Sequence, residues 1–179
     1  DLRYVLVDFP FEEPDLAAAV WLSAIFTKLL RFAFSGNIPL LAASAGMASS
    51  GKGKLPDTAA IITEGAEAEK RNYTGDDAED ERVIGSTVAD EVPVAVLDNI
   101  KRGVALASAA FEMYLTTPKF ATRRIGTSEN IRVEKGSWTD TLWWATGNDL
   151  TTSGDMARRV LRIGINDRTG RPEDREVAE

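Results

Sequence analysis

The sequence predicts an α/β fold, a three-layer sandwich in which helices cover both faces of a mostly parallel central sheet. The reason is that short apolar runs bounded by turn residues, which are typical of buried parallel strands, alternate with helix-like segments. The composition is that of an ordinary globular protein, since 44% of the 179 residues are hydrophobic and 27% are charged. This length allows one domain with a sizeable core.

The N-terminal part is expected to be helical. Pro14 or Asp15 opens a helix over residues 14–33, and the turn sequence SGN at 35–37 ends it. Its apolar residues run nearly all round the helix, which predicts packing on more than one side. The segment is too short and too polar to span a bilayer, and no signal peptide is visible. We therefore expect a cytoplasmic protein without membrane contact.

The remaining elements follow from short patterned segments. The adjacent Trp143 and Trp144 should face opposite sides of one strand and be structural. We expect a helical part (1–37), a core (38–166) and a charged tail (167–179), which together form a single domain and a fragment of a longer protein. The core should contain, in chain order, a strand IPLLAAS from Ile38, a helix over about 52–64, an amphipathic helix within DDAEDERVIGSTVAD, a strand VPVAVLDN, a helix over 104–115, a hairpin of TRRIG and NIRVE around GTSEN, and the strands DTLWWATGN and RVLRIGI.

The composition excludes several kinds of site. The chain has no cysteine and no histidine, so disulfides, thiolate or histidine metal sites and a histidine general base are impossible within it. The net charge of −7 comes from one segment, because ten acidic and three basic residues lie between Glu64 and Glu91 while the remainder is neutral. A protein that coats duplex DNA over a broad face is usually basic, so any contact with nucleic acid must be local.

The clearest functional motif is GMASSGKG at residues 46–53, of the form G-x-x-x-x-G-K between a predicted strand and a predicted helix. Its glycines allow backbone N–H groups to point at phosphate oxygens, and Lys52 supplies positive charge to the β and γ phosphates of ATP. The alternative is a flexible Gly/Ser loop. The residues expected to bind the nucleotide are Gly46, Ser49, Ser50, Gly51, Lys52 and Gly53.

The motif departs from the full pattern at Gly53, where a serine or threonine normally binds Mg²⁺. Metal binding would then depend on other groups and on water. Ser49, Ser50 and Thr58 are close to this position in the sequence.

A second motif, VAVLDN, carries Asp98 to the C-terminal end of an apolar strand, where ligands of open α/β sheets bind. An aspartate there can hold Mg²⁺, although an aspartate that merely ends a strand is the alternative. Asn99 follows Asp98. Many ATPases with a G-x-x-x-x-G-K loop have a glutamate at this position that polarises the attacking water, and asparagine cannot act as a general base. Candidates for that task, by charge alone, are Glu64, Asp90 and Glu91.

Two further signals lie downstream. LWWATGN ends an apolar strand at Asn148, where a polar side chain can orient water and sense the γ-phosphate; a turn asparagine beside Gly147 is the alternative. GDMARRV places Arg158 and Arg159 before the last strand. An arginine offered to a neighbouring subunit's nucleotide stabilises transition-state charge, whereas the alternative is a pair of surface or carboxylate-paired arginines.

Together these motifs resemble the superfamily-three helicases and the poxvirus-type primase-helicase ATPases of the AAA+ group of P-loop NTPases. The closer resemblance is to a set of phage and integrative-element proteins of the primase- or helicase-like kind. The resemblance covers nearly the whole chain and is carried by VDFPF, GKGKLPD, YTGDDAEDER, VLDNI, WWATGN and GDMARRVLRI. It implies that Lys52 binds phosphate, Asp98 binds metal, Asn148 is the sensor, and Arg158 or Arg159 is the arginine finger.

The resemblance also implies a β-hairpin, inserted between the strands of Asp98 and Asn148, that grips DNA in the central channel of a ring. The segment from Lys119 to Lys135 lies in that interval and has a net charge of +3. A solvated surface hairpin is the alternative. The side chains expected to contact single-stranded or forked DNA are Arg123, Arg124, Arg132 and Lys135.

The function expected from these observations is that of a ring-forming, helicase-like ATPase motor of a phage or mobile-element replication protein, with ATP and Mg²⁺ as cofactors and a hexameric ring as its assembly. Gly53 lacks the hydroxyl, and Asn99 the carboxylate, that are usual at these positions. The alternative is therefore a nucleotide-dependent assembly switch with little or no hydrolysis. A third reading, an interaction domain whose loop no longer binds nucleotide, is disfavoured by the intact Gly51 and Lys52.

Overall fold

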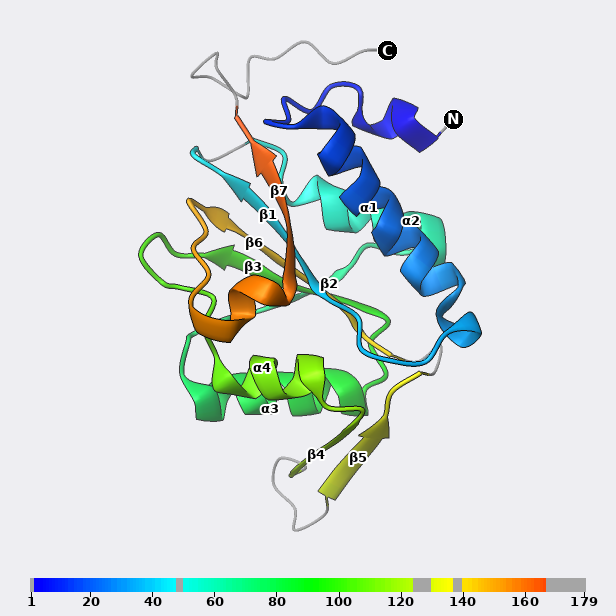
Figure 1. Cartoon of the computed structure of the whole chain (residues 1–179), viewed down its shortest axis with the longest axis vertical. Coiled ribbons are helices and arrows are strands. Elements are labelled where there is room, and N and C mark those ends of the chain that lie inside the picture. The colour runs from blue at the N-terminus through cyan, green and yellow to red at the C-terminus, as the bar shows by residue number, and fades with distance from the viewer. Residues whose placement is uncertain (1, 48–49, 124–129, 137–139, 167–179) are drawn as a thin grey trace.

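The computed structural model describes residues 2–47, 50–123, 130–136 and 140–166 (Figure 1). A five-stranded sheet has the order β2-β3-β6-β1-β7, and every neighbouring pair in it is parallel. Its strands are β1 (Leu40–Ala45), β2 (Glu69–Arg71), β3 (Val94–Ile100), β6 (Leu142–Asn148) and β7 (Val160–Ile165).

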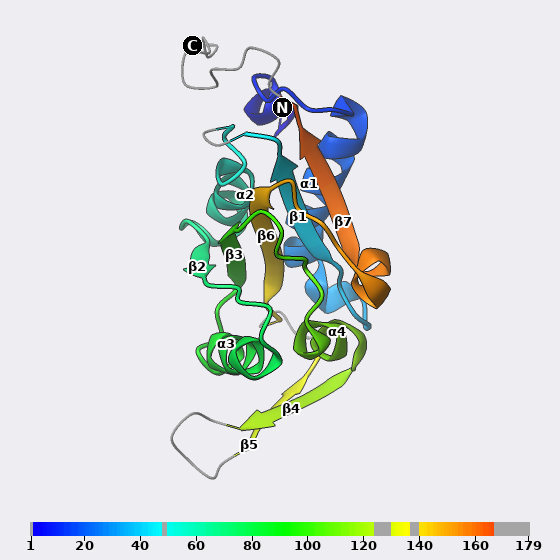
Figure 2. The same cartoon turned by 90° about the vertical axis from the view of Figure 1, so that its left-hand side faces the viewer.

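Helices cover both faces of this sheet, which makes the three-layer sandwich predicted from the sequence (Figures 1 and 2). On one face lie α1 (Pro14–Leu29) and α2 (Lys54–Glu64), and on the other α3 (Asp77–Ala89) and α4 (Ala109–Thr116). Short 3-10 turns complete the helical part: η1 (Leu2–Leu6), η2 (Arg31–Ala33) and η3 (Gly154–Arg158).

The core consists of two layers of side chains separated by the sheet. Alternation along β6 places Trp144 in the layer under α1 and α2 and Trp143 in the layer under α3 and α4, which confirms that the two tryptophans face opposite sides. Trp143 packs edge-on against Phe111 of α4, with ring centroids 5.0 Å apart. In the other layer Trp21 of α1 donates its indole N–H to the carbonyl of Leu55, at 3.0 Å, and so joins α1 to α2.

The predicted hairpin is present as a separate two-stranded sheet of β4 (Lys119–Arg123) and β5 (Asn130–Glu134). Its first strand was expected over TRRIG at 122–126, whereas β4 begins at Lys119, and residues 124–129 lie outside the described part of the chain. It extends beyond α3 and α4 at the end of the molecule where β6 begins, away from the C-terminal ends of the parallel strands (Figure 1). β6 therefore runs from the base of the hairpin to the opposite edge of the sheet.

Two helix boundaries and one strand differ from the sequence prediction. The first helix ends at Leu29 and continues as the 3-10 turn η2 rather than as α-helix to residue 33. The helix expected over 104–115 begins only at Ala109, because Ser108 caps it by accepting the N–H of Phe111, while Leu106 is buried and bridges to Thr152. Strand β2 was not predicted, since its sequence EKR has no apolar pattern. In the described part of the chain, no helix is long and apolar enough to cross a membrane.

Candidate functional site

The loop between β1 and α2 carries the G-x-x-x-x-G-K motif, as predicted. Gly51 has a φ of +83°, a left-handed conformation that favours glycine, and its carbonyl accepts the N–H of Lys54 at 2.8 Å. Gly53 sits at the N-cap of α2, so the helix N-terminus faces the loop. Gly46 follows β1 directly, and Ser49 lies outside the described residues.

The predicted polar residues meet at one edge of the sheet because β6 lies between β1 and β3. The register pairs Ala45 with Asn148, and Lys52 Nζ donates to Asn148 Oδ1 at 2.8 Å. Asp98 lies on β3, on the other side of β6. A pocket of about 280 Å³ opens here, and its lining residues are Ser50, Gly51, Lys52, Gly53, Asp98, Asn99 and Thr146.

This pocket is lined by one cationic side chain, Lys52, and one carboxylate, Asp98. Burial lowers the pKa of the Lys52 ammonium from its usual 10.5, and the nearby Asp98 carboxylate opposes that shift. Ser50 is only 1% exposed, and its hydroxyl has no hydrogen-bond partner among the described residues. A buried hydroxyl of this kind is costly unless a ligand or water engages it, so Ser50 is a second polar group available to a phosphate.

Asp98 is the carboxylate of this pocket that could hold Mg²⁺. Among the described residues there is no cluster of three or more acidic side chains that could bind a metal ion. Mg²⁺ is commonly held by one or two carboxylates together with substrate phosphates and water, and Asp98 can supply that carboxylate. The hydroxyl of Thr58, considered above for the metal, instead bonds the carbonyls of Lys54 and Leu55 within its own helix.

Sequence reasoning missed Thr146, which lies two residues before Asn148 on the same face of β6. Its hydroxyl donates to Asp98 Oδ1 at 2.6 Å and accepts the backbone N–H of Asn99 at 3.1 Å. The only sequence signal was the period of two, which puts Thr146 and Asn148 on the face turned toward the phosphate loop.

Gly147 separates these two polar residues and has no room for a side chain. A Cβ there would lie 2.7 Å from the carbonyl oxygen of Ile100 and 2.7 Å from Cδ2 of Leu150. We expect Gly147→Ala to destabilise the chain by about 1–3 kcal/mol, because backbone must move to relieve the clash. Urea denaturation would measure this, with Gly53→Ala as the control, since a Cβ at Gly53 meets nothing within 4 Å. Equal stability of the two variants would contradict the close packing of β3 and β6.

The structure separates the three acidic candidates for water activation from this pocket. Glu64 ends α2 and lies 3.8 Å from Lys28, which in turn bonds the carbonyl of Asp140, just before β6. Asp90 and Glu91 precede β3, so the length of that strand divides them from Asp98. All three are therefore at the far edge of the sheet and cannot serve the pocket of their own chain.

Arg158 and Arg159 also lie at the far edge, at the end of η3. The N–H of Leu40, the first residue of β1, donates to the carbonyl of Arg159 at 3.0 Å. Arg158 is exposed, whereas Arg159 is half-buried with its side chain 3.8 Å from Asp155. The structure therefore does not bring either arginine to the Lys52 pocket of the same chain.

The predicted nucleic-acid residues differ in their surroundings. Arg132 is exposed on β5. Lys135 is half-buried, with its ammonium 4.2 Å from the centre of the Tyr114 ring, and burial lowers its pKa to about 8. Arg124 and the side chain of Arg123 lie outside the described part of the chain.

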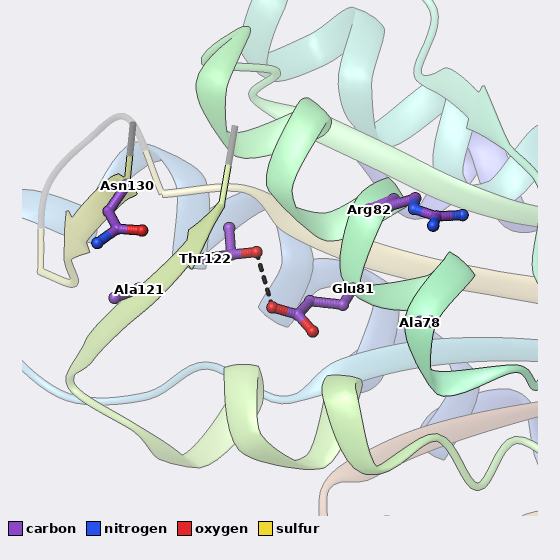
Figure 3. Close-up of a pocket in the computed structure, with 6 residues that line it drawn as sticks. All are labelled: Ala78, Glu81, Arg82, Ala121, Thr122 and Asn130. Carbon is purple, nitrogen blue, oxygen red and sulfur yellow. Dashed lines mark hydrogen bonds between the residues drawn. The ribbon is translucent and has the colours of Figure 1, made fainter. Parts of the chain in front are cut away.

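A hydrogen bond connects the described part of the hairpin to α3. Thr122 of β4 is 7% exposed and donates to Glu81 Oε1 at 2.9 Å, across a pocket of about 550 Å³ between hairpin and helix (Figure 3). Arg82 points away from this bond, and Asn130 lines the pocket from β5 (Figure 3). The orientation of the hairpin is therefore tied to α3 as well as to its own base.

Removing this hydrogen bond should loosen the hairpin. Thr122→Val keeps the side-chain shape but loses a bond with a net contribution of about 1 kcal/mol, so we expect amide hydrogen exchange in β4 and β5 to rise about fivefold. Thr116→Val is the matched control, because Thr116 is exposed and its hydroxyl donates only to carbonyls of α4 in the described structure. Equal exchange in both variants would mean that other contacts orient the hairpin.

Comparison with known proteins supports the fold. No protein-family model matches the chain, and no curated protein sequence matches it. The apo structure (A form) of the C-terminal region of NrS-1 matches with a TM-score of 0.54 at 15% identity, over 97% of this chain and 43% of that chain. JCV helicase, solved with a bound small molecule, matches with a TM-score of 0.51 at 13% identity, over 84% of this chain and 44% of that chain. The chain thus has an α/β fold similar to that of a viral helicase and spans less than half the length of either structure.

Proposed function

We propose that this chain is the ATP-binding and ATP-hydrolysing motor domain of a helicase-like DNA replication protein from a phage or mobile element. The observation that carries the proposal is a pocket at one sheet edge that Lys52 and Asp98 line together with the phosphate loop, with Asn148 hydrogen-bonded to Lys52 beside it. The helicase-like fold supports the same proposal.

In this proposal the chain's own groups hold the triphosphate and order its surroundings. Backbone N–H groups of the loop and the ammonium of Lys52 bind the phosphates, and Ser50 offers a further hydroxyl. Asn148, bonded to Lys52 Nζ at 2.8 Å, is adjacent to the place where the γ-phosphate would lie. Mg²⁺, when bound with the nucleotide, neutralises charge that develops on the phosphate oxygens, and Asp98 is the carboxylate that would hold it.

The proposed active unit is an oligomer, ultimately a hexameric ring. Arg158 is exposed at the sheet edge opposite to the pocket, so it can stabilise transition-state charge only in a neighbouring subunit. The hairpin is proposed to contact single-stranded or forked DNA through Arg132 with Arg123 and Arg124. A few phosphate contacts from each subunit would add up around a ring.

The decisive experiment is ATP hydrolysis by the chain with Mg²⁺, in the presence and absence of single-stranded DNA. We expect DNA to stimulate turnover, and Arg132→Glu to remove the stimulation while ATP binding persists. Arg82→Glu is the matched control, since Arg82 is also exposed but points away from the hairpin (Figure 3). Stimulation that survives Arg132→Glu would remove the hairpin from the proposal, and turnover without any response to DNA would count against a DNA motor.

A second candidate function, an assembly switch with little hydrolysis, is favoured by Gly53 and Asn99. The structure offers a direct test, because Gly53 has a φ of −69° and open space for a Cβ, so Gly53→Ser restores the usual hydroxyl without strain. A motor limited by metal binding should hydrolyse ATP faster after this change. A switch should bind ATP and oligomerise with it, and turnover should stay negligible in both the parent chain and Gly53→Ser.

A further inference from the structure

A β-bulge in β3 lies at the metal-binding aspartate. Leu97 pairs with Ala145 and Ile100 pairs with Gly147, so Asp98 and Asn99 together lie opposite the one residue Thr146. Asn99 adopts a left-handed φ of +54° within this bulge. Bulges leave a backbone group without its ladder partner and re-aim the neighbouring side chains, and they are common next to active sites.

Thr146 compensates for this irregularity with a single hydroxyl. The N–H of Asn99 donates to Thr146 Oγ1 at 3.1 Å, and Thr146 Oγ1 donates to Asp98 Oδ1 at 2.6 Å. The donor and acceptor directions agree, since a hydroxyl accepts one hydrogen bond while it gives another. The threonine is 1% exposed and its rotamer is restricted by β-branching, so the hydroxyl is held in one position.

Thr146 therefore holds one oxygen of the Asp98 carboxylate, although Asp98 itself is exposed. Carboxylates that bind metal depend on hydrogen bonds from outer groups for their orientation. This dependence is strong here, because Gly53 supplies no hydroxyl and Asn99 no carboxylate beside Asp98.

We propose that Thr146 is the positioning residue for the magnesium–nucleotide, acting through Asp98 and through the backbone of Asn99. The inference rests on the proposed nucleotide function. Thr146 lies on β6, between β1 and β3. From there it would order the magnesium-binding groups, a role that Gly53 of the phosphate loop and Asn99 of β3 cannot fulfil.

The test is the ratio of the dissociation constants for a fluorescent ATP analogue measured in EDTA and in Mg²⁺. This ratio reports how much the metal strengthens binding. Thr146→Val removes the hydroxyl and keeps the shape, and we expect it to lower the ratio roughly tenfold, as is typical when an outer partner of a metal ligand is lost. Thr146→Ser keeps the hydroxyl, so its ratio should stay within about threefold of the parent chain. Because this position is buried, Thr146→Ala provides a second matched pair with Thr146→Ser should the valine variant fail to fold.

A purely structural role predicts a different outcome. If Thr146 only supports β6, its loss should weaken binding in EDTA and in Mg²⁺ by the same factor, and an unchanged ratio in the valine and alanine variants would overturn the inference while leaving the proposed function intact. A parent chain that binds no nucleotide under either condition would instead overturn the proposed function, and this inference with it.

Discussion

ATP should stabilise this chain, and Lys52→Ala should remove most of that stabilisation. A ligand present at 100 times its dissociation constant stabilises a protein by about 2.7 kcal/mol, which for a chain of this size corresponds to a rise in melting temperature of roughly 5–10 °C. Loss of a charge that is half-buried against phosphate should weaken affinity about 100-fold. At the same ATP concentration the variant should then gain only about 1 °C.

The measurement is thermal unfolding with and without Mg²⁺-ATP. Lys54→Ala is the matched control, because Lys54 is two residues away but is exposed at the first position of α2, and it should keep the full ATP-induced shift. A shift that persists in Lys52→Ala would mean that the nucleotide binds elsewhere. A parent chain without any shift would contradict the nucleotide-binding proposal itself.

Loss of the buried ion pair between Arg31 and Asp140 should produce the largest fall in stability. Nε and Nη2 of Arg31 both donate to Asp140 Oδ2, at 2.8 and 2.6 Å, and the two residues are 1% and 3% exposed. Asp140→Ala leaves a guanidinium buried without its carboxylate, so we expect the free energy of unfolding to fall by roughly 3–5 kcal/mol. Urea denaturation would measure the change.

Two comparisons make this prediction specific. Glu79→Ala removes the carboxylate that pairs with Arg82 on the surface of α3, and it should cost at most about 1 kcal/mol because both side chains are exposed. The double variant Arg31→Met with Asp140→Leu should recover much of the stability lost in Asp140→Ala, since it removes both charges of the pair. If Asp140→Ala costs no more than Glu79→Ala, the buried pair does not hold this region together.

The pair also has a structural consequence for the hairpin. Asp140 Oδ2 accepts the N–H of Gly136, just after β5, at 2.8 Å, and Arg31 additionally bonds the carbonyls of Phe34 and Gly36. The carboxylate therefore joins the N-terminal helical part to the base of the hairpin. Hydrogen exchange in β5 should increase together with the loss of global stability in Asp140→Ala.

Apart from β2 and the 3-10 turns, the sequence by itself determined the order of the elements, and it singled out Lys52, Asp98 and Asn148. Apolar runs ending in Asp98 and Asn148, and a glycine loop ending in Lys52, are local patterns, and the period of two fixes which face of a strand each side chain occupies. Because the strands are parallel, their C-terminal ends meet at one edge, and the structure brings Lys52 to Asn148 there, at 2.8 Å.

Only the tertiary structure decided which side chains hydrogen-bond to these residues and which candidates lie away from the pocket. Thr146 meets Asp98 through a bulge between β3 and β6, and a register shift across two strands leaves no mark in either sequence segment. Glu64 was a candidate by charge, yet α2 carries it to the opposite edge of the sheet. Lys135 was expected among the side chains that contact DNA, and the structure places its ammonium over the ring of Tyr114. Local patterns report the backbone direction and the face of a residue, whereas its neighbours depend on strand order, register and packing, which are set by contacts between segments far apart in the chain.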